Sequence, residues 1–119
     1  MNDQYLPSRD RLPEGFNLPP AYVDVVRSGH LPDIEPWWWL CIRKQSYDFW
    51  FEKLKEQFPD RILVPFAKME DSDDLACFDG GCQIGSPKVL YIHAYTTSGW
   101  EHRGEESDFD AWLNSISKK

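Results

Sequence analysis

Three stretches of the chain repeat their apolar residues with the spacing of a helix. Residues 20–28 show this spacing. The Pro19-Pro20 pair is typical of a helix start and Gly29 of a helix end, so a short helix is predicted here. Residues 45–58 form the clearest amphipathic helix, with Tyr47, Trp50, Phe51, Leu54 and Phe58 on one side. A last helix is predicted after Ser107, placed as N-cap, with Asp110 returning the capping bond. Its apolar face comprises Phe109, Trp112, Leu113 and Ile116.

Between the second and the last helix the apolar pattern changes to one typical of strands. Residues 61–66, 74–79 and 88–95 are short runs rich in aliphatic and aromatic side chains. The Asp-Gly-Gly sequence at 79–81 predicts a tight hairpin turn, because glycine tolerates the positive φ angles that such turns require. The Gly-Ser-Pro sequence at 85–87 predicts the next turn.

This order of elements predicts the fold class. Helices first, an antiparallel meander next and a helix last describe a single α+β domain with a largely antiparallel sheet, whose helices cover one face of the sheet. A chain of 119 residues provides one core. Prolines concentrate in the first third, and we interpret residues 1–17 as a proline-containing leader and residues 18–119 as the domain.

The charge of the chain narrows the possible partners. The formal net charge is -7, and acids exceed bases in both halves. This balance disfavours nucleic acid and anionic membranes, because lysine and arginine supply the contacts to phosphate. A basic protein partner is electrostatically favoured. The chain shows no secretion signal and no apolar run of membrane-spanning length. Its three cysteines, an odd number, are more typical of reduced thiols than of a disulfide framework. We therefore expect a cytoplasmic protein.

An acidic loop precedes the strand predicted at 74–79. Its four carboxylates fall within five positions: Glu70, Asp71, Asp73 and Asp74. Carboxylates suit Ca²⁺ or Mg²⁺, but an EF-hand counted from Asp71 would place Ala76 where glycine is needed and Cys82 where glutamate is needed. The spacing is more typical of a solvated acidic turn, and no metal or cofactor is predicted.

Cys77, Cys82 and His93 raise two further possibilities. The two cysteines and the histidine could contribute to a zinc site, although their spacing is at the edge of what structural zinc tolerates and no second pair exists. Cys77 with His93 and Asp79 could instead serve as nucleophile, base and orienting acid. Neither arrangement is supported by a surrounding signature, so ordinary strand residues are the favoured interpretation.

Three adjacent tryptophans occur in "EPWWWLCI", residues 35–42. Neighbouring residues in any regular element point in different directions, so the three indoles cannot all enter one core. At least one is expected to be partly exposed, where it either covers a loop or contributes to a contact surface.

Several of these segments, taken in order, resemble the SUKH superfamily, which contains fungal Smi/Knr-type regulators and many bacterial toxin-immunity proteins. The resemblance spans residues 12–116 and rests on five short motifs: "LPPAYVDVVRSG" (18–29), "EPWWWLCI" (35–42), "LVPFAKMEDSDDLACFDGG" (63–81), "PKVLYIHAY" (87–95) and "SDFDAWLNSI" (107–116).

The resemblance implies a non-enzymatic binding domain that neutralises a cognate toxin, often a nuclease, by forming a protein complex. The carboxylates expected to meet a basic toxin domain are Glu70, Asp71, Asp73, Asp74, Glu101, Glu105, Glu106 and Asp108. A housekeeping protein-interaction scaffold of the same fold is one alternative. A small hydrolase or metal-dependent enzyme using Cys77, His93 or the acidic loop is another.

Overall fold

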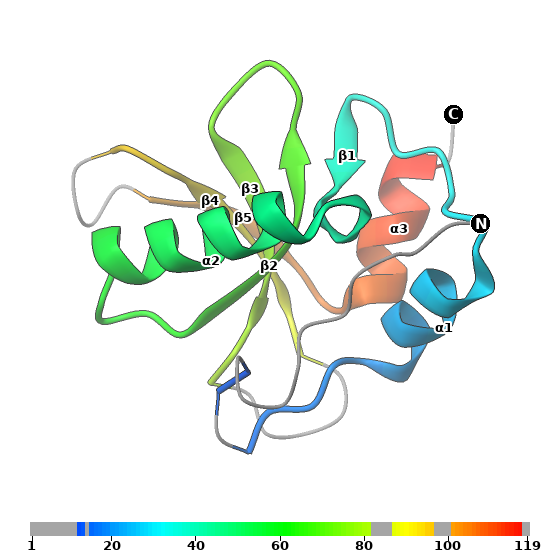
Figure 1. Cartoon of the computed structure of the whole chain (residues 1–119), viewed down its shortest axis with the longest axis horizontal. Coiled ribbons are helices and arrows are strands. Elements are labelled where there is room, and N and C mark those ends of the chain that lie inside the picture. The colour runs from blue at the N-terminus through cyan, green and yellow to red at the C-terminus, as the bar shows by residue number, and fades with distance from the viewer. Residues whose placement is uncertain (1–11, 14, 82–86, 97–100, 118–119) are drawn as a thin grey trace.

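Helices flank a meander of strands in the computed structural model, which describes residues 12–13, 15–81, 87–96 and 101–117 (Figure 1). The described elements are α1 (Pro20–Ser28), β1 (Trp37–Trp39), the 3-10 turn η1 (Leu40–Ile42), α2 (Lys44–Gln57), β2 (Leu63–Met69), β3 (Asp74–Asp79), β4 (Val89–His93), β5 (His102–Glu106) and α3 (Phe109–Ser117).

The five strands found in the described part of the chain belong to one sheet, and every neighbouring pair is antiparallel. Their order in the sheet is the order in the chain, β1-β2-β3-β4-β5, with α2 connecting the first strand to the second. The predicted α+β class and the largely antiparallel sheet are confirmed. Among the described residues, no helix is both long and apolar enough to cross a bilayer.

Helices cover both faces of the sheet, so the expectation that they cover one face is wrong. Leu75 and Phe78 lie three residues apart on β3 and therefore point to opposite faces. Phe78 contacts Tyr22 of α1 and Phe109 of α3. On the other face, Lys68, which is opposite Leu75 in the ladder, lies over Trp50 of α2. Figure 1 shows α2 lying across the strands on the face of the sheet that is turned toward the viewer.

The predicted helices are confirmed, and two strands were missed. Helix α1 has the predicted bounds, begins at Pro20 and ends at Gly29, whose φ of 78° is left-handed. Strand β3 also has the predicted bounds, whereas β2 begins two residues later than expected and runs on to Met69. Strands β1 and β5 were not predicted, because the first has three residues and the second is almost entirely polar.

The connection from β3 to β4 is not the tight hairpin predicted at 79–81. Phe78 pairs with Val89, so the connection is much longer than two residues. Gly80 is instead required by close packing, because a Cβ there would lie 2.7 Å from Cγ2 of Ile62. Its N–H donates to the Ile62 carbonyl at 2.8 Å. The turn predicted at 85–87 falls largely outside the described residues.

Helix α3 is capped by Asp108 and not by Ser107. Its first helical residue is Phe109, and Oδ1 of Asp108 accepts the N–H of Ala111 at 2.8 Å. Starting the helix at Phe109 lets Phe109 and Trp112 both enter the core, where they are almost fully buried. The residue immediately before that start is therefore the one that caps.

The folded unit extends N-terminal of residue 18. Phe16 is fully buried, and its ring centroid lies 6.5 Å from that of Phe78. Tyr22 lies at the centre of the same aromatic cluster, 5.7 Å from Phe66 and 5.5 Å from Phe109. Burial raises the pKa of Tyr22 well above its ordinary value, and the neighbouring Tyr47 adds to the effect.

Candidate functional site

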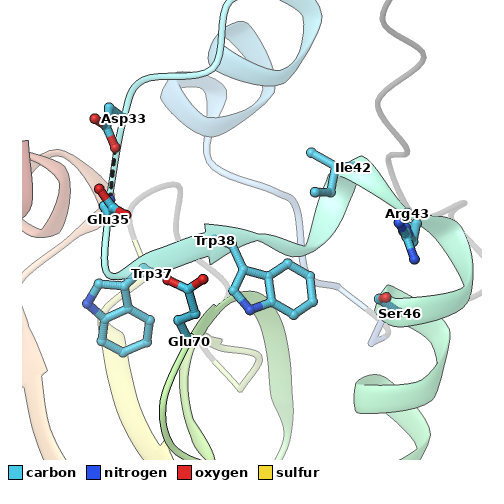
Figure 2. A pocket seen from close by; sticks show the side chains of 8 residues that line it. All are labelled: Asp33, Glu35, Trp37, Trp38, Ile42, Arg43, Ser46 and Glu70. Carbon is cyan, nitrogen blue, oxygen red and sulfur yellow. Dashed lines mark hydrogen bonds between the residues drawn. The ribbon is translucent and has the colours of Figure 1, made fainter.

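A groove beside β1 brings together two segments that the sequence singled out separately. We call it the β1 groove. It is open to solvent, has a volume of about 630 Å³ and includes the first two tryptophans of β1 and one acid of the acidic loop (Figure 2). The residues lining it are Asp33, Glu35, Trp37, Trp38, Ile42, Arg43, Ser46 and Glu70.

The indoles of Trp37 and Trp38 are partly exposed, whereas Trp39 is buried. This confirms that the three tryptophans do not share one environment. Trp37 is anchored by Trp112 and Tyr91, whose ring centroids lie 6.1 and 5.8 Å away. Trp38 points to the opposite face of the strand. Each indole therefore offers part of its surface to the groove while the backbone of β1 is held in the sheet.

Local hydrogen bonds place the carboxylates of the groove. The N–H of Glu70 donates to the Pro36 carbonyl at 2.8 Å, which ties the acidic loop to the segment before β1. In that segment, Oδ1 of Asp33 accepts the N–H of Glu35 at 3.1 Å. Ile34 between them is buried, so the two acids flank an apolar anchor and both remain exposed.

Charge is distributed unevenly along the groove. Asp33 and Glu35 lie at one end, Arg43 and Ser46 lie at the other, and Glu70 lies between the two indoles in Figure 2. The described residues that line the groove include three carboxylates and one guanidinium, so this part of the lining carries a net negative charge that is greatest at the Asp33 end. Such an arrangement attracts a cation to that end and repels one from the Arg43 end.

Of the eight carboxylates expected to meet a partner, one lies in the groove. Glu70 does so, and the neighbouring Asp71 is exposed at the β2–β3 turn. Asp73 is partly buried, and its carbonyl accepts the N–H of Ala94 at 2.9 Å. Four others hold partners within the chain: Asp74 with His93, Glu105 with Lys88, Glu106 with Tyr91, and Asp108 with the start of α3.

Glu101 is buried and does not present a surface charge. It is 5% exposed, and its carboxylate pairs with Nε of Arg61. The Glu101 carbonyl also accepts the N–H of His93 at 2.8 Å. This residue belongs to the structural framework that joins the turn after α2 to the start of β5.

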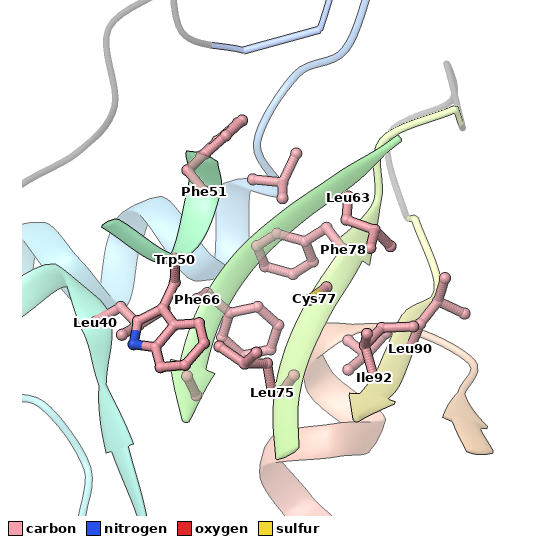
Figure 3. Packing of buried hydrophobic residues seen from close by; sticks show 14 of the residues in the cluster. Leu40, Trp50, Phe51, Leu63, Phe66, Leu75, Cys77, Phe78, Leu90 and Ile92 are labelled. Carbon is pink, nitrogen blue, oxygen red and sulfur yellow. The ribbon is translucent and has the colours of Figure 1, made fainter. Parts of the chain in front are cut away.

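Cys77, His93 and Asp79 do not come together as a nucleophile, base and orienting acid. Cys77 pairs with Leu90 in the ladder, whereas His93 pairs with Asp74, three positions along the strand and on the opposite face. Figure 3 shows Cys77 surrounded by apolar side chains. His93 bonds Asp74 at 2.6 Å instead. The zinc alternative includes Cys82, which lies outside the described residues.

Both described cysteines are expected to be chemically inert in the folded protein. Burial raises the pKa of Cys41 to about 12 and raises the pKa of Cys77 as well. A raised pKa lowers the fraction of thiolate at pH 8, and the thiolate is the species that reacts. In a Cys82→Ser variant, iodoacetamide should therefore add nothing to the native chain and should modify two thiols after unfolding in guanidinium. A single adduct on the native protein, detected by intact mass, would contradict this expectation.

Within the described part of the chain, no group of three or more His, Cys, Asp or Glu side chains is arranged to hold a metal ion. The acidic loop accordingly gathers no such set around Asp74. Its described carboxylates are engaged separately or directed to solvent.

Most of the groove was not predicted from the sequence. The tryptophans and Glu70 were singled out, and Glu35 and Ile42 were included only as the ends of "EPWWWLCI", whereas Asp33, Arg43 and Ser46 were not named. A usable signal was present in "DIEPWW", where acids alternate with apolar residues directly before the tryptophans. Ile42 also stands out as an apolar residue that is 49% exposed.

Comparisons with known proteins found nothing: no family model matches the chain, and neither the curated proteins nor the solved structures gave a significant match.

Proposed function

We propose that this chain is an intracellular immunity protein that neutralises a toxin domain with a basic surface, such as a nuclease domain, by forming a protein complex. The observation that supports binding is the β1 groove, in which two partly exposed indoles stand among three carboxylates. Partly buried aromatic residues are the usual anchors of protein interfaces, and carboxylates steer a basic partner toward them.

Two further features agree with this proposal. The net charge of -7 favours association with the basic surface that a nuclease needs to hold phosphate. The immunity role itself rests on the SUKH resemblance, and the antiparallel α+β fold is consistent with that resemblance. The inert setting of Cys77 gives no support to the hydrolase alternative.

Co-expression tests the proposal directly. A toxin encoded next to this chain should kill cells when expressed alone, and the chain should restore growth and co-elute with the toxin at one to one. If the toxin still kills and no complex elutes, the proposal is wrong. A complex with a cellular protein, without protection from any toxin, would favour the scaffold alternative.

Charge reversal locates the interface. Glu70→Lys should slow association with the toxin about tenfold at low salt, and the difference should shrink as salt is raised. Asp60→Lys makes the same charge change in the exposed turn after α2 and is the matched control. Equal effects of the two variants would mean that only net charge matters and that the groove is not the contact.

A further inference from the structure

We propose that the β1 groove is a receptor for one arginine side chain of a basic partner, with the guanidinium held at the Asp33 end. This proposal rests on the proposed function, because it takes the partner to be a basic protein, and it names the group that the groove recognises. Its evidence comes from the edge of the sheet, the two indoles and the distribution of charge.

Addition of a partner strand to β1 is disfavoured. The Glu70 N–H donates to the Pro36 carbonyl, and hydrogen-bonded pairs alternate along an antiparallel ladder. The N–H and C=O of Trp38 therefore point toward β2, whereas those of Trp37 and Trp39 point outward. The outward N–H of Trp37 already donates to the Ile34 carbonyl at 2.8 Å. An edge strand of three residues with one outward donor in use offers little backbone to a partner. Recognition must therefore come mainly from side chains.

The indoles supply surfaces on which a cation can lie. No ring contact is recorded for Trp38 among the described residues, whereas Trp37 is fixed from behind by Trp112 and Tyr91. The chain already uses this chemistry beside α2, where Nζ of Lys68 lies 5.5 Å from the ring of Trp50. A cation above an indole gains about 0.5 to 2 kcal/mol, depending on how far it is desolvated.

The groove suits arginine better than lysine. A guanidinium is planar, so it can stack on an indole while its edge bonds a carboxylate through two parallel N–H groups. Glu70 lies between the indoles in Figure 2, and its side chain has no hydrogen-bond or ion-pair partner among the described residues. Asp33 and Glu35 add negative charge at the end of the groove away from Arg43. An ammonium group would satisfy the charge but neither the stacking nor the forked geometry.

Arg43 gives the proposal its sharpest test, since it is the one cation among the described residues that line the groove. Arg43→Glu should strengthen binding of an arginine by about threefold to tenfold, because it removes a repulsion and adds an attraction. A gain of affinity cannot be produced by misfolding. Lys55→Glu makes the same charge change twelve residues along, about 18 Å away at the other end of α2, and is the matched control.

The experiment uses the full chain and three blocked tripeptides, Gly-Arg-Gly, Gly-Lys-Gly and Gly-citrulline-Gly. Binding is followed by NMR at the indole N–H signals of Trp37 and Trp38, assigned by single Trp→Phe substitutions. The arginine peptide should shift both signals with millimolar affinity, about tenfold more tightly than the citrulline peptide, whose side chain has nearly the same shape without the charge. The lysine peptide should fall between them.

Three results would overturn the proposal: citrulline binding as tightly as arginine, lysine binding as tightly as arginine, or Arg43→Glu gaining no more than Lys55→Glu. The peptide titration needs no toxin, so it separates this inference from the proposed function. Peptide binding without any toxin complex would refute the immunity role and leave the arginine site standing. A toxin complex that is insensitive to Glu70→Gln and Arg43→Glu would leave the immunity role standing and remove the groove from it.

Discussion

Replacing Trp112 with alanine is expected to lower the free energy of unfolding by about 3 to 5 kcal/mol, a large share of the stability of a domain of this size. Trp112 is fully buried and contacts aromatic rings from two strands. Its ring centroid lies 4.8 Å from that of Phe66 and 5.9 Å from that of Trp39. Its removal leaves a cavity where α3 meets the sheet. Urea denaturation followed by far-UV circular dichroism measures the change, and Phe49→Ala, at a half-exposed ring, should cost less than about 1 kcal/mol.

A second variant at the same position separates packing from polarity. Nε1 of Trp112 is buried and has no hydrogen-bond partner among the described residues. A buried unpaired N–H costs about 1 to 3 kcal/mol, so Trp112→Phe removes a penalty together with some packing. We expect it to cost about 1 kcal/mol or less. A loss as large as that of Trp112→Ala would show that the indole nitrogen is satisfied in solution.

The same residues explain how much of the fold was predictable. Helices α1 and α2 follow from a period that repeats over several turns, and local residues mark their ends. That both faces of the sheet are covered could also have been predicted from the sequence. Strands β2 and β3 contain runs of consecutive apolar residues, "LVPFA" and "LACF", which are typical of strands buried on both sides. Alternation alone would have indicated one buried face.

Other features depend on contacts that no local pattern encodes. The register of β2 against β3 shifts between Pro65 and Ala67, so that Phe66 is an extra residue and lies on the same face as Phe78. Strand β5 has exposed and half-buried polar side chains because it is an edge, and it is a strand only through its pairing with β4. A polar sequence of this kind predicts a loop.

The candidate site could be predicted from the sequence only in part. The groove contains two of the three tryptophans and Glu70, but the seven other carboxylates named from the sequence lie outside it. The reason is distance along the chain: Asp74 meets His93 nineteen residues later, and Arg61 meets Glu101 forty residues later. A single sequence does not reveal which acids are already paired by such contacts.

The Arg61–Glu101 pair provides the second large expected effect. Arg61→Met should lower the free energy of unfolding by about 2 to 4 kcal/mol, somewhat less than the usual cost of breaking a buried pair because the arginine is itself 34% exposed. Methionine preserves much of the packing of the side chain, so the loss reports on the charge. The buried carboxylate of Glu101 would remain in the core without this guanidinium.

The two members of the pair should not be equivalent, although each substitution breaks the same contact. Glu101→Gln leaves a guanidinium that can turn toward water, so it should lower the free energy of unfolding by only about 1 kcal/mol. Arg61→Met, in contrast, leaves the carboxylate charge of Glu101 in the interior. In the double variant the buried charge of Glu101 is absent, and part of the loss in Arg61→Met should be recovered. Lys88→Met, which breaks the exposed pair with Glu105, should leave stability nearly unchanged. Equal costs for Arg61→Met and Glu101→Gln, with additive effects in the double variant, would mean that Glu101 is solvated in solution, and its carboxylate would then return to the set of charges available to a partner.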